Sequence, residues 1–256
     1  MARPLHLFFI IVCLSFLPLD LFSANKTFTG PGNFSDATKW SSGTLPVAGD
    51  NLLINGSCIF DNAASNLAYG NLVVGSSANA TLSWPSSGTN TLNVAAISSN
   101  AVGGTINMTN GGTLQVRTSW TTTSQTFIPG TGTVNWNASG TTTLPAAIGT
   151  YHKLTITVGT GNVTLGTGTT INSNFTIASG TFIIGGQNIT CNGTTSISGV
   201  LEDNANGGTN TFTNITINAG GSINNTVNET YSLSGNFTMF GGNITGNGQA
   251  TYNISG

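Results

Sequence analysis

Charged side chains are scarce in this sequence. Only 5% of its 256 residues are Asp, Glu, Lys or Arg, against about 25% in an ordinary soluble domain. Beyond Ala24 the cationic side chains are those of Lys26, Lys39, Arg117 and Lys153. Because nucleic-acid binding depends on many Lys and Arg contacts with phosphates, this composition excludes a nucleic-acid partner.

Groups that could perform acid–base chemistry are also few. Between Leu154 and Val200 no side chain is ionisable except that of Cys191, and His152 is the single histidine after Ala24. Glycoside hydrolysis needs two carboxyl groups at a defined separation, and one histidine cannot build a zinc site or a Ser-His-Asp triad convincingly. We therefore expect a protein that is not an enzyme and that carries no cofactor or metal.

The one acidic pair is Glu202-Asp203, in the segment "EDNANGG". Adjacent residues on a strand point to opposite faces, so we interpret this segment as a solvated corner. A calcium site that adds backbone oxygens and Asn204 is the alternative.

Cysteines are too few for a disulfide framework. Cys58 and Cys191 are the two that follow the N-terminal segment ending at Ala24, and they are far apart in the sequence. We expect both to be small, buried, apolar side chains without a disulfide.

Long apolar runs are confined to the N-terminus. Arg3 precedes an apolar run from Leu7 to Leu17, and Ser23-Ala24 offers a cleavage site. This predicts a secretory signal peptide over residues 1–24 and a secreted or cell-surface protein without a later membrane span. A membrane anchor is the alternative, but the run is shorter than the roughly 20 residues that a spanning helix needs.

What the sequence does contain is alternation. In "NFTIASGTFIIGGQNITCNG", residues 174–193, apolar residues occupy every second position between Gly, Ser and Asn. Similar short segments fill the chain after the N-terminus, and none shows helical spacing over two turns. This pattern predicts an all-β protein.

A repeated tripeptide narrows the architecture. Asn-apolar-Thr recurs at nearly even spacing, with its apolar residue at Val163, Ile189, Ile215 and Ile244. We expect a right-handed parallel β-helix in which these residues form one inward column. Thr164, Thr190, Thr216 and Thr245 would form an outward column, and Asn and Gly would occupy corners that need positive φ. A β-sandwich is the alternative.

We predict five regions along this chain. They are a signal peptide (1–24), an N-terminal cap and first coil (25–61), a first β-helix block (62–120), an irregular coil or junction (121–150), and a second block with repeats of about 26 residues (151–256). Because the last residues stop in mid-pattern, we also expect a longer natural protein, truncated here at its C-terminus.

Two stretches resemble a known family. "WSSGTLPVAGDNLLI" (40–54) is similar to a pattern near the start of large secreted surface proteins of Bacteroidota, and "FIPGTGTVNW" (127–136) followed by "TYHKLTI" (150–156) resembles their recurrent unit. The resemblance implies a β-helix in an exported, adhesin-like protein. Such proteins often carry a C-terminal sorting domain, which this sequence lacks.

We therefore expect a β-helical stalk or adhesive surface on the cell exterior, with extracellular glycans or other cell surfaces as partners. The first alternative is carbohydrate binding or processing, with Trp120, Trp136 and Tyr151 as a ligand patch. The second alternative is ice binding by the outward threonines. The many Asn-x-Ser/Thr sequons follow from Asn corners that lead into Thr-bearing strands.

Overall fold

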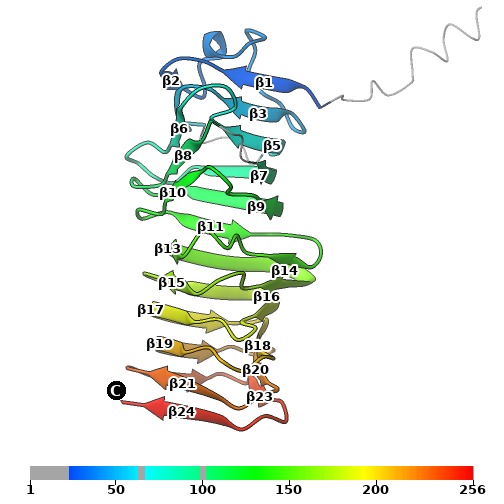
Figure 1. Ribbon diagram of the computed structural model, residues 1–256, viewed down its shortest axis with the longest axis vertical. Coiled ribbons are helices and arrows are strands. Elements are labelled where there is room, and N and C mark those ends of the chain that lie inside the picture. The colour runs from blue at the N-terminus through cyan, green and yellow to red at the C-terminus, as the bar shows by residue number, and fades with distance from the viewer. Residues whose placement is uncertain (1–22, 63–66, 99–101, 256) are drawn as a thin grey trace, which may run out of the picture.

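The computed structural model describes residues 23–62, 67–98 and 102–255. Within these ranges the chain winds into one elongated solenoid of parallel strands (Figure 1). The described residues contain no α-helix, only the short 3-10 helix η1 (Ala37–Lys39). The predicted all-β, parallel β-helical architecture is therefore confirmed. The predicted signal peptide, residues 1–24, falls almost entirely outside the described ranges.

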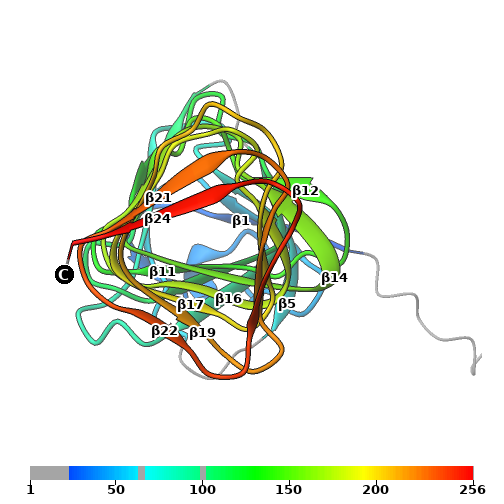
Figure 2. The same ribbon diagram turned by 90° about the horizontal axis from the view of Figure 1, so that it is seen from below.

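The solenoid has three faces, and an end view gives it a roughly triangular outline (Figure 2). Face 1 contains β5 (Ala68–Val74), β7 (Thr91–Ser98), β9 (Thr113–Trp120), β11 (Thr133–Trp136), β14 (Lys153–Thr164), β16 (Phe175–Ile183), β17 (Ile189–Ile197), β19 (Asn210–Ile217) and β22 (Phe237–Met239). The longer of these strands bend around a corner, so one part of each lies on a neighbouring face.

Face 2 contains the later parts of β5, β7, β9, β14 and β16, together with β1 (Asn25–Phe28), β3 (Asn51–Ile54), β12 (Thr142–Thr143), β18 (Val200–Asp203), β20 (Ser222–Asn225) and β23 (Asn243–Thr245). Face 3 begins with a separate sheet of β2 (Gly32–Asn33), β4 (Ser57–Ile59), β6 (Ala80–Ser83), β8 (Gly104–Asn107) and β10 (Thr126–Ile128). It continues with β13 (Thr150–Tyr151), β15 (Thr169–Ile171), the early parts of β17 and β19, β21 (Glu229–Leu233) and β24 (Ala250–Ile254).

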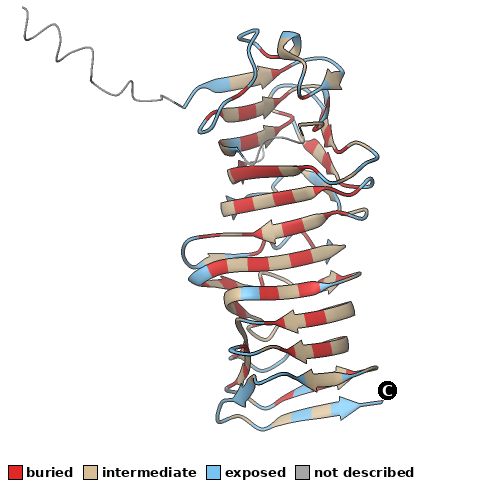
Figure 3. Cartoon of the chain, turned by 180° about the vertical axis from the view of Figure 1, so that it is seen from behind, coloured by how far each residue is buried: buried red, intermediate tan, exposed pale blue. Residues whose placement is uncertain are grey.

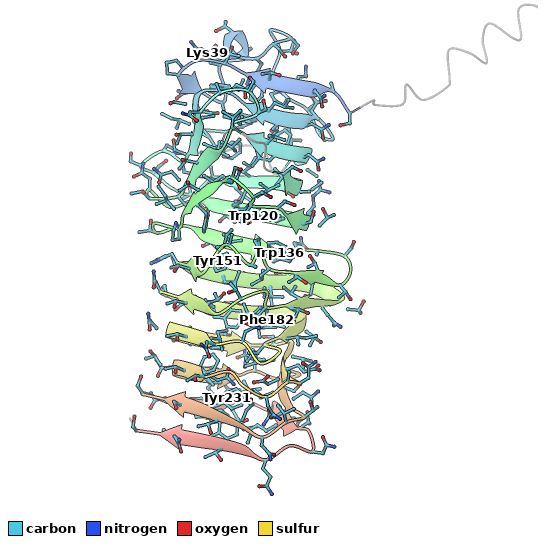
Figure 4. The ribbon with its side chains drawn as sticks, in the orientation of Figure 1. Lys39, Trp120, Trp136, Tyr151, Phe182 and Tyr231 are labelled. Atoms are coloured by element: carbon cyan, nitrogen blue, oxygen red, sulfur yellow. The ribbon has the colours of Figure 1, made fainter. Side chains whose placement is uncertain are left out.

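Alternating burial along each strand places one apolar set inside the solenoid (Figure 3). On face 2, Val163 pairs with Phe182, which pairs with Leu201, and the same column continues to Ile223. All four side chains are fully buried. Phe182, labelled in Figure 4, also packs edge-on against the Phe175 ring at 4.9 Å. Each such side chain contributes about 1.5–3 kcal/mol through burial, and the contacts are made with the coils above and below.

The columns differ from those that the repeat predicted. Val163 lies on face 2, Ile189 on face 3 and Ile215 on face 1, so the predicted inward column of these residues and Ile244 is wrong.

The true repeat is shorter than the spacing of the motif. On face 1, Ile156, Ile177, Ile197 and Ile217 pair in succession. One coil on this face therefore takes about 20 residues, which lies at the short end of the range for solenoid repeats.

From one copy of the motif to the next, the chain completes one coil and then continues along one further face. The Asn-apolar-Thr motif thus moves from face to face, and it marks the start of a strand on any of them. For the same reason Thr164, Thr190 and Thr216 lie on three different faces and form no common outward column.

Asparagine and glycine have different roles at the corners. Within the described residues positive φ is found only at glycine, so the expectation that Asn also adopts it is wrong. Asn side chains instead connect one coil to the next through hydrogen bonds. The Oδ1 atom of Asn214 accepts the backbone N–H of Asn236 at 2.8 Å, and that of Asn188 accepts the N–H of Thr209 at 2.8 Å.

Replacing Asn214 by Ala should destabilise the solenoid by about 1–2 kcal/mol, because the N–H of Asn236 loses its acceptor at a corner. Urea unfolding followed by circular dichroism measures this change. Asn236→Ala is the matched control one coil further on, because the side chain of Asn236 is exposed, and it should change stability by less than about 0.5 kcal/mol. Equal effects of the two substitutions would contradict the proposed role of the inter-coil amide bond.

Candidate functional site

The carboxylates of the N-terminal coils are engaged in local structure. Asp36 caps η1 and accepts hydrogen bonds from the backbone and hydroxyl of Thr38, which lower its pKa. Asp50 accepts a hydrogen bond from the backbone N–H of Val47 at 3.0 Å. Asp61 accepts two hydrogen bonds from Ser35, one from its backbone N–H and one from its hydroxyl. These groups hold loops in place and leave no carboxylate of these coils aimed at an open cleft.

The described residues contain no group of three or more His, Cys, Asp or Glu side chains that could hold a metal ion. His152 is half-buried, and burial together with the adjacent Lys153 lowers its pKa. Cys58 and Cys191 are buried and free, as the sequence predicted, and burial raises the pKa of both thiols.

The aromatic residues predicted as a ligand patch lie inside the solenoid (Figure 4). Trp136 and Tyr151 are fully buried and Trp120 is 5% exposed. Trp120 and Tyr151 flank Phe127, with ring centroids 5.1 Å and 6.0 Å from it, and Trp120 donates its indole N–H to Gln125. In this arrangement they pack the core and present no stacking surface to a sugar, which corrects the predicted patch.

The outer surface carries ladders of hydroxyl groups in place of the predicted threonine column. On face 1 the outward positions of successive coils are paired in register and include Thr155, Thr176, Ser196, Thr216 and Thr238. On face 3 a second ladder runs through Thr150, Thr170, Thr190, Thr211 and Ser232. Successive hydroxyls are separated by the rung spacing of about 4.8 Å.

A third ladder lines a surface hollow of about 450 Å³ on face 3. Its floor consists of Ser57, Thr81, Thr105 and Thr126, which are outward positions of the separate five-stranded sheet. No residue lining this hollow is ionisable. The hollow therefore offers hydroxyl and backbone groups for hydrogen bonding, and none for acid–base catalysis.

Two neighbouring inward columns change from apolar to polar at one corner between faces 2 and 3. The column that ends face 2 reads Ile184 in one coil, then Asp203 and Asn225 in the next two. The column that begins face 3 reads Ile189 and then Asn210. We call the side chains gathered at this corner, Asp203, Asn210, Asn225, Glu229 and Tyr231, the corner cluster.

Sequence reasoning predicted a solvated corner at Glu202-Asp203, and for Asp203 this is wrong. Asp203 is fully buried, whereas Glu202 points outward and accepts hydrogen bonds from Asn204 and Asn224 at 2.9 and 3.1 Å. The strand alternation that turns one residue out turns the next one in. The repeated tripeptide has a longer spacing than the coil, so it did not reveal that Asp203 pairs with Asn225 in the next coil.

Hydrogen bonding inside the corner cluster is incomplete. Asn210 donates its Nδ2 to Asp203 Oδ2 at 2.8 Å, and Glu229 Oε1 accepts the backbone N–H of Gly207 at 3.0 Å. Asp203 Oδ1, Asn210 Oδ1, both amide atoms of Asn225 and the Tyr231 hydroxyl are buried without a partner. Polar atoms in protein interiors are almost always paired, so this corner is exceptional.

Burial raises the pKa of Asp203, the hydrogen bond from Asn210 opposes that rise, and the negative charge of Glu229 adds to it. Two nearby backbone N–H groups oppose the rise more weakly. The same environment raises the pKa of Tyr231, chiefly by burial and then through Asp203, Tyr252 and Glu229. The two carboxyl groups are therefore close enough for their charges to interact, and the tyrosine hydroxyls stay neutral.

The raised pKa of Asp203 makes the stability of the folded chain depend on pH. Protonation of this carboxyl favours the folded state, so its stabilising effect is fully present below its unfolded value of about 3.8. The effect is lost as pH rises through the raised folded value. Glu229 and Tyr231 are the other titratable groups that interact with it.

In a buffer free of divalent cations, we expect the free energy of unfolding to fall as pH rises above about 4. The fall should be about 1.4 kcal/mol for each unit by which the pKa of Asp203 is raised. Asp203→Asn should remove this part of the pH dependence, whereas Glu202→Gln, at the adjacent outward carboxylate, should retain it. Chemical unfolding at a series of pH values measures both. A slope in Asp203→Asn equal to that of the parent would contradict this assignment.

No helix in the described part of the chain is long and apolar enough to cross a membrane. No model of a known protein family matches the chain, and no match was found among curated proteins or solved structures.

Proposed function

We propose that this chain is a non-enzymatic β-helical stalk of an exported cell-surface protein, with an outer surface suited to adhesion. The observation that carries the proposal is the continuity of the parallel ladder from the first to the last described coil, combined with an exterior of hydroxyl and amide groups. The resemblance to exported surface proteins and the signal-like N-terminus support the location.

The ladder provides rigid reach. Every coil is hydrogen-bonded to its neighbours along its strands, and corner amides add further inter-coil bonds. A spacing of about 4.8 Å between coils gives a rod of roughly 45–50 Å over the described residues. Such a unit can hold a partner away from a membrane without a flexible linker.

The exterior provides many weak, uncharged contacts. The hydroxyl ladders repeat at the spacing of the coils, so one extended polymer can meet equivalent groups on several coils at once. Each hydrogen bond contributes only about 0.5–1.5 kcal/mol, but several along one polymer add to a useful affinity. Since few charges take part, binding should depend weakly on salt.

The hydroxyl-lined hollow favours carbohydrate binding as the second candidate function. Its volume suits one or two sugar rings, and Thr105 and Asn79 line it together with backbone groups. Processing of the bound sugar is not supported, because the lining lacks an acid and a base. Ice binding is a weaker alternative, because the threonines first predicted to form one column lie on separate faces.

We expect the labelled chain to bind at least one immobilised polysaccharide or cell surface, with affinity that changes less than about threefold between low and physiological salt. Fluorescence measurements of binding to a panel of surfaces test this, alongside an assay for released reducing ends. Failure to bind every surface would remove the adhesive role and leave only the stalk. Release of reducing ends would overturn the non-enzymatic proposal.

Two matched substitutions locate the binding surface. Thr105→Val removes one hydroxyl from the hollow with little change in shape, and should weaken polysaccharide binding roughly 2- to 10-fold if the hollow is the site. Thr176→Val makes the same change on face 1. A loss confined to Thr176→Val would instead assign adhesion to the face 1 ladder.

A further inference from the structure

We propose that the corner cluster is an internal calcium site that ties together the last described coils. The cluster lies inside the solenoid and is separate from the outer surfaces considered above. It joins Asp203 and Asn210 of one coil to Asn225, Glu229 and Tyr231 of the next. Tyr231 is labelled in Figure 4. The inference is therefore independent of the proposed adhesive function.

The charge of the corner requires a counter-ion. Asp203 is fully buried and Glu229 is 7% exposed, so both carboxyl groups are largely removed from water. The sequence contains no Lys, Arg or His after Lys153, and hence no side-chain cation from these coils can neutralise them. A buried carboxylate without a counter-charge costs several kcal/mol, so the fully buried Asp203 needs either a proton or a bound cation.

The unpaired atoms favour a cation over protons. Asp203 Oδ1, Asn210 Oδ1 and Asn225 Oδ1 are three buried oxygens that lack a hydrogen bond of good geometry, although the backbone N–H groups of Gly186 and Ala205 lie near enough to the Asp203 carboxyl to oppose the rise in its pKa. Protonation of Asp203 would add one donor, which pairs at most one of the two amide oxygens. A cation coordinated by oxygens can satisfy all three at once and also balance the two carboxyl groups.

The existing hydrogen bonds already orient the oxygens. The Nδ2 of Asn210 is used by Asp203 Oδ2, and the Oδ1 of the same amide is left without a partner. The backbone N–H of Gly207 holds Glu229 in the same corner through Oε1. Asn225 is 1% exposed and follows Asp203 directly in the column, so its side chain is confined to the same space.

The donor set selects the type of ion. The oxygens of the cluster belong to carboxylates, amides and one tyrosine hydroxyl, calcium prefers oxygen ligands, and no imidazole belongs to the cluster. Calcium accepts six to eight oxygens with flexible geometry, which suits two carboxyl groups, two amides, and backbone or water oxygens. Magnesium requires a near-ideal octahedron, which mixed side chains on separate coils satisfy less readily.

Calcium titration of the full chain after EDTA treatment tests the site. We expect saturable binding of one ion by calorimetry, and a rise in Tm of about 5–10 °C when free calcium exceeds its Kd about 100-fold. Terbium, a luminescent substitute for calcium, should give emission sensitised by Tyr231 that calcium displaces.

Two carboxylate substitutions supply the matched comparison. Asp203→Asn should weaken calcium binding at least about 100-fold, and Glu202→Gln, at the outward neighbour, should change it less than about twofold. Their circular dichroism spectra in EDTA check that both variants fold. Should Asp203→Asn disturb folding, Asn210→Ser keeps a small polar side chain and should still weaken binding.

Three results would overturn the proposal. They are an absence of calcium binding by the parent chain, equal calcium binding by the parent and Asp203→Asn, or loss of binding in Glu202→Gln instead. If the parent chain does not bind calcium but gains stability at low pH, the cluster instead contains a protonated Asp203 and buried water.

Discussion

The hydrogen-bonded pairing of each coil with the next is the constraint on which this structure depends. A single coil buries few side chains by itself, and its backbone groups find partners only in the coils above and below. The pairing fixes which residues lie above one another, and so determines both the apolar columns inside and the hydroxyl ladders outside. A shift of the pairing by one residue would turn the inward side chains outward and change every column and ladder.

The corner cluster shows how the same constraint creates a chemical site from residues that look ordinary in the sequence. Asp203 and Asn225 meet because they are one coil apart in one column, and Asn210 joins them because face 3 begins at the same corner. The coil above fills these positions with Ile184 and Ile189, which need no partner. A local exchange of apolar for polar residues thus turns a section of core into a site with oxygen ligands.

The alternation of apolar and polar residues was sufficient to predict an all-β solenoid, and the small number of widely separated cysteines was sufficient to predict that both are buried and free. The alternation was insufficient for the coil length, because Val163, Ile189 and Ile215 share a motif that marks the start of a strand on any face. Trp120, Trp136 and Tyr151 are buried because each occupies an inward position of its strand in the observed register. The spacing of the repeated tripeptide did not give that register. Asp203 was misplaced for the same reason. The hydroxyl ladders could be found only once the pairing was known.

The most direct test of the coil register is the formation of engineered disulfides between outward residues. Thr176 and Ser196 are paired on face 1, and neighbouring Cα atoms at about 4.8 Å lie within bridging range. Thr176→Cys combined with Ser196→Cys should oxidise readily to an intramolecular disulfide, detected by electrophoretic mobility and mass spectrometry. Thr190→Cys combined with Thr216→Cys, which occupy equivalent motif positions but lie on different faces, should remain reduced. Bridging of the second pair without the first would contradict the parallel register on which this account is built.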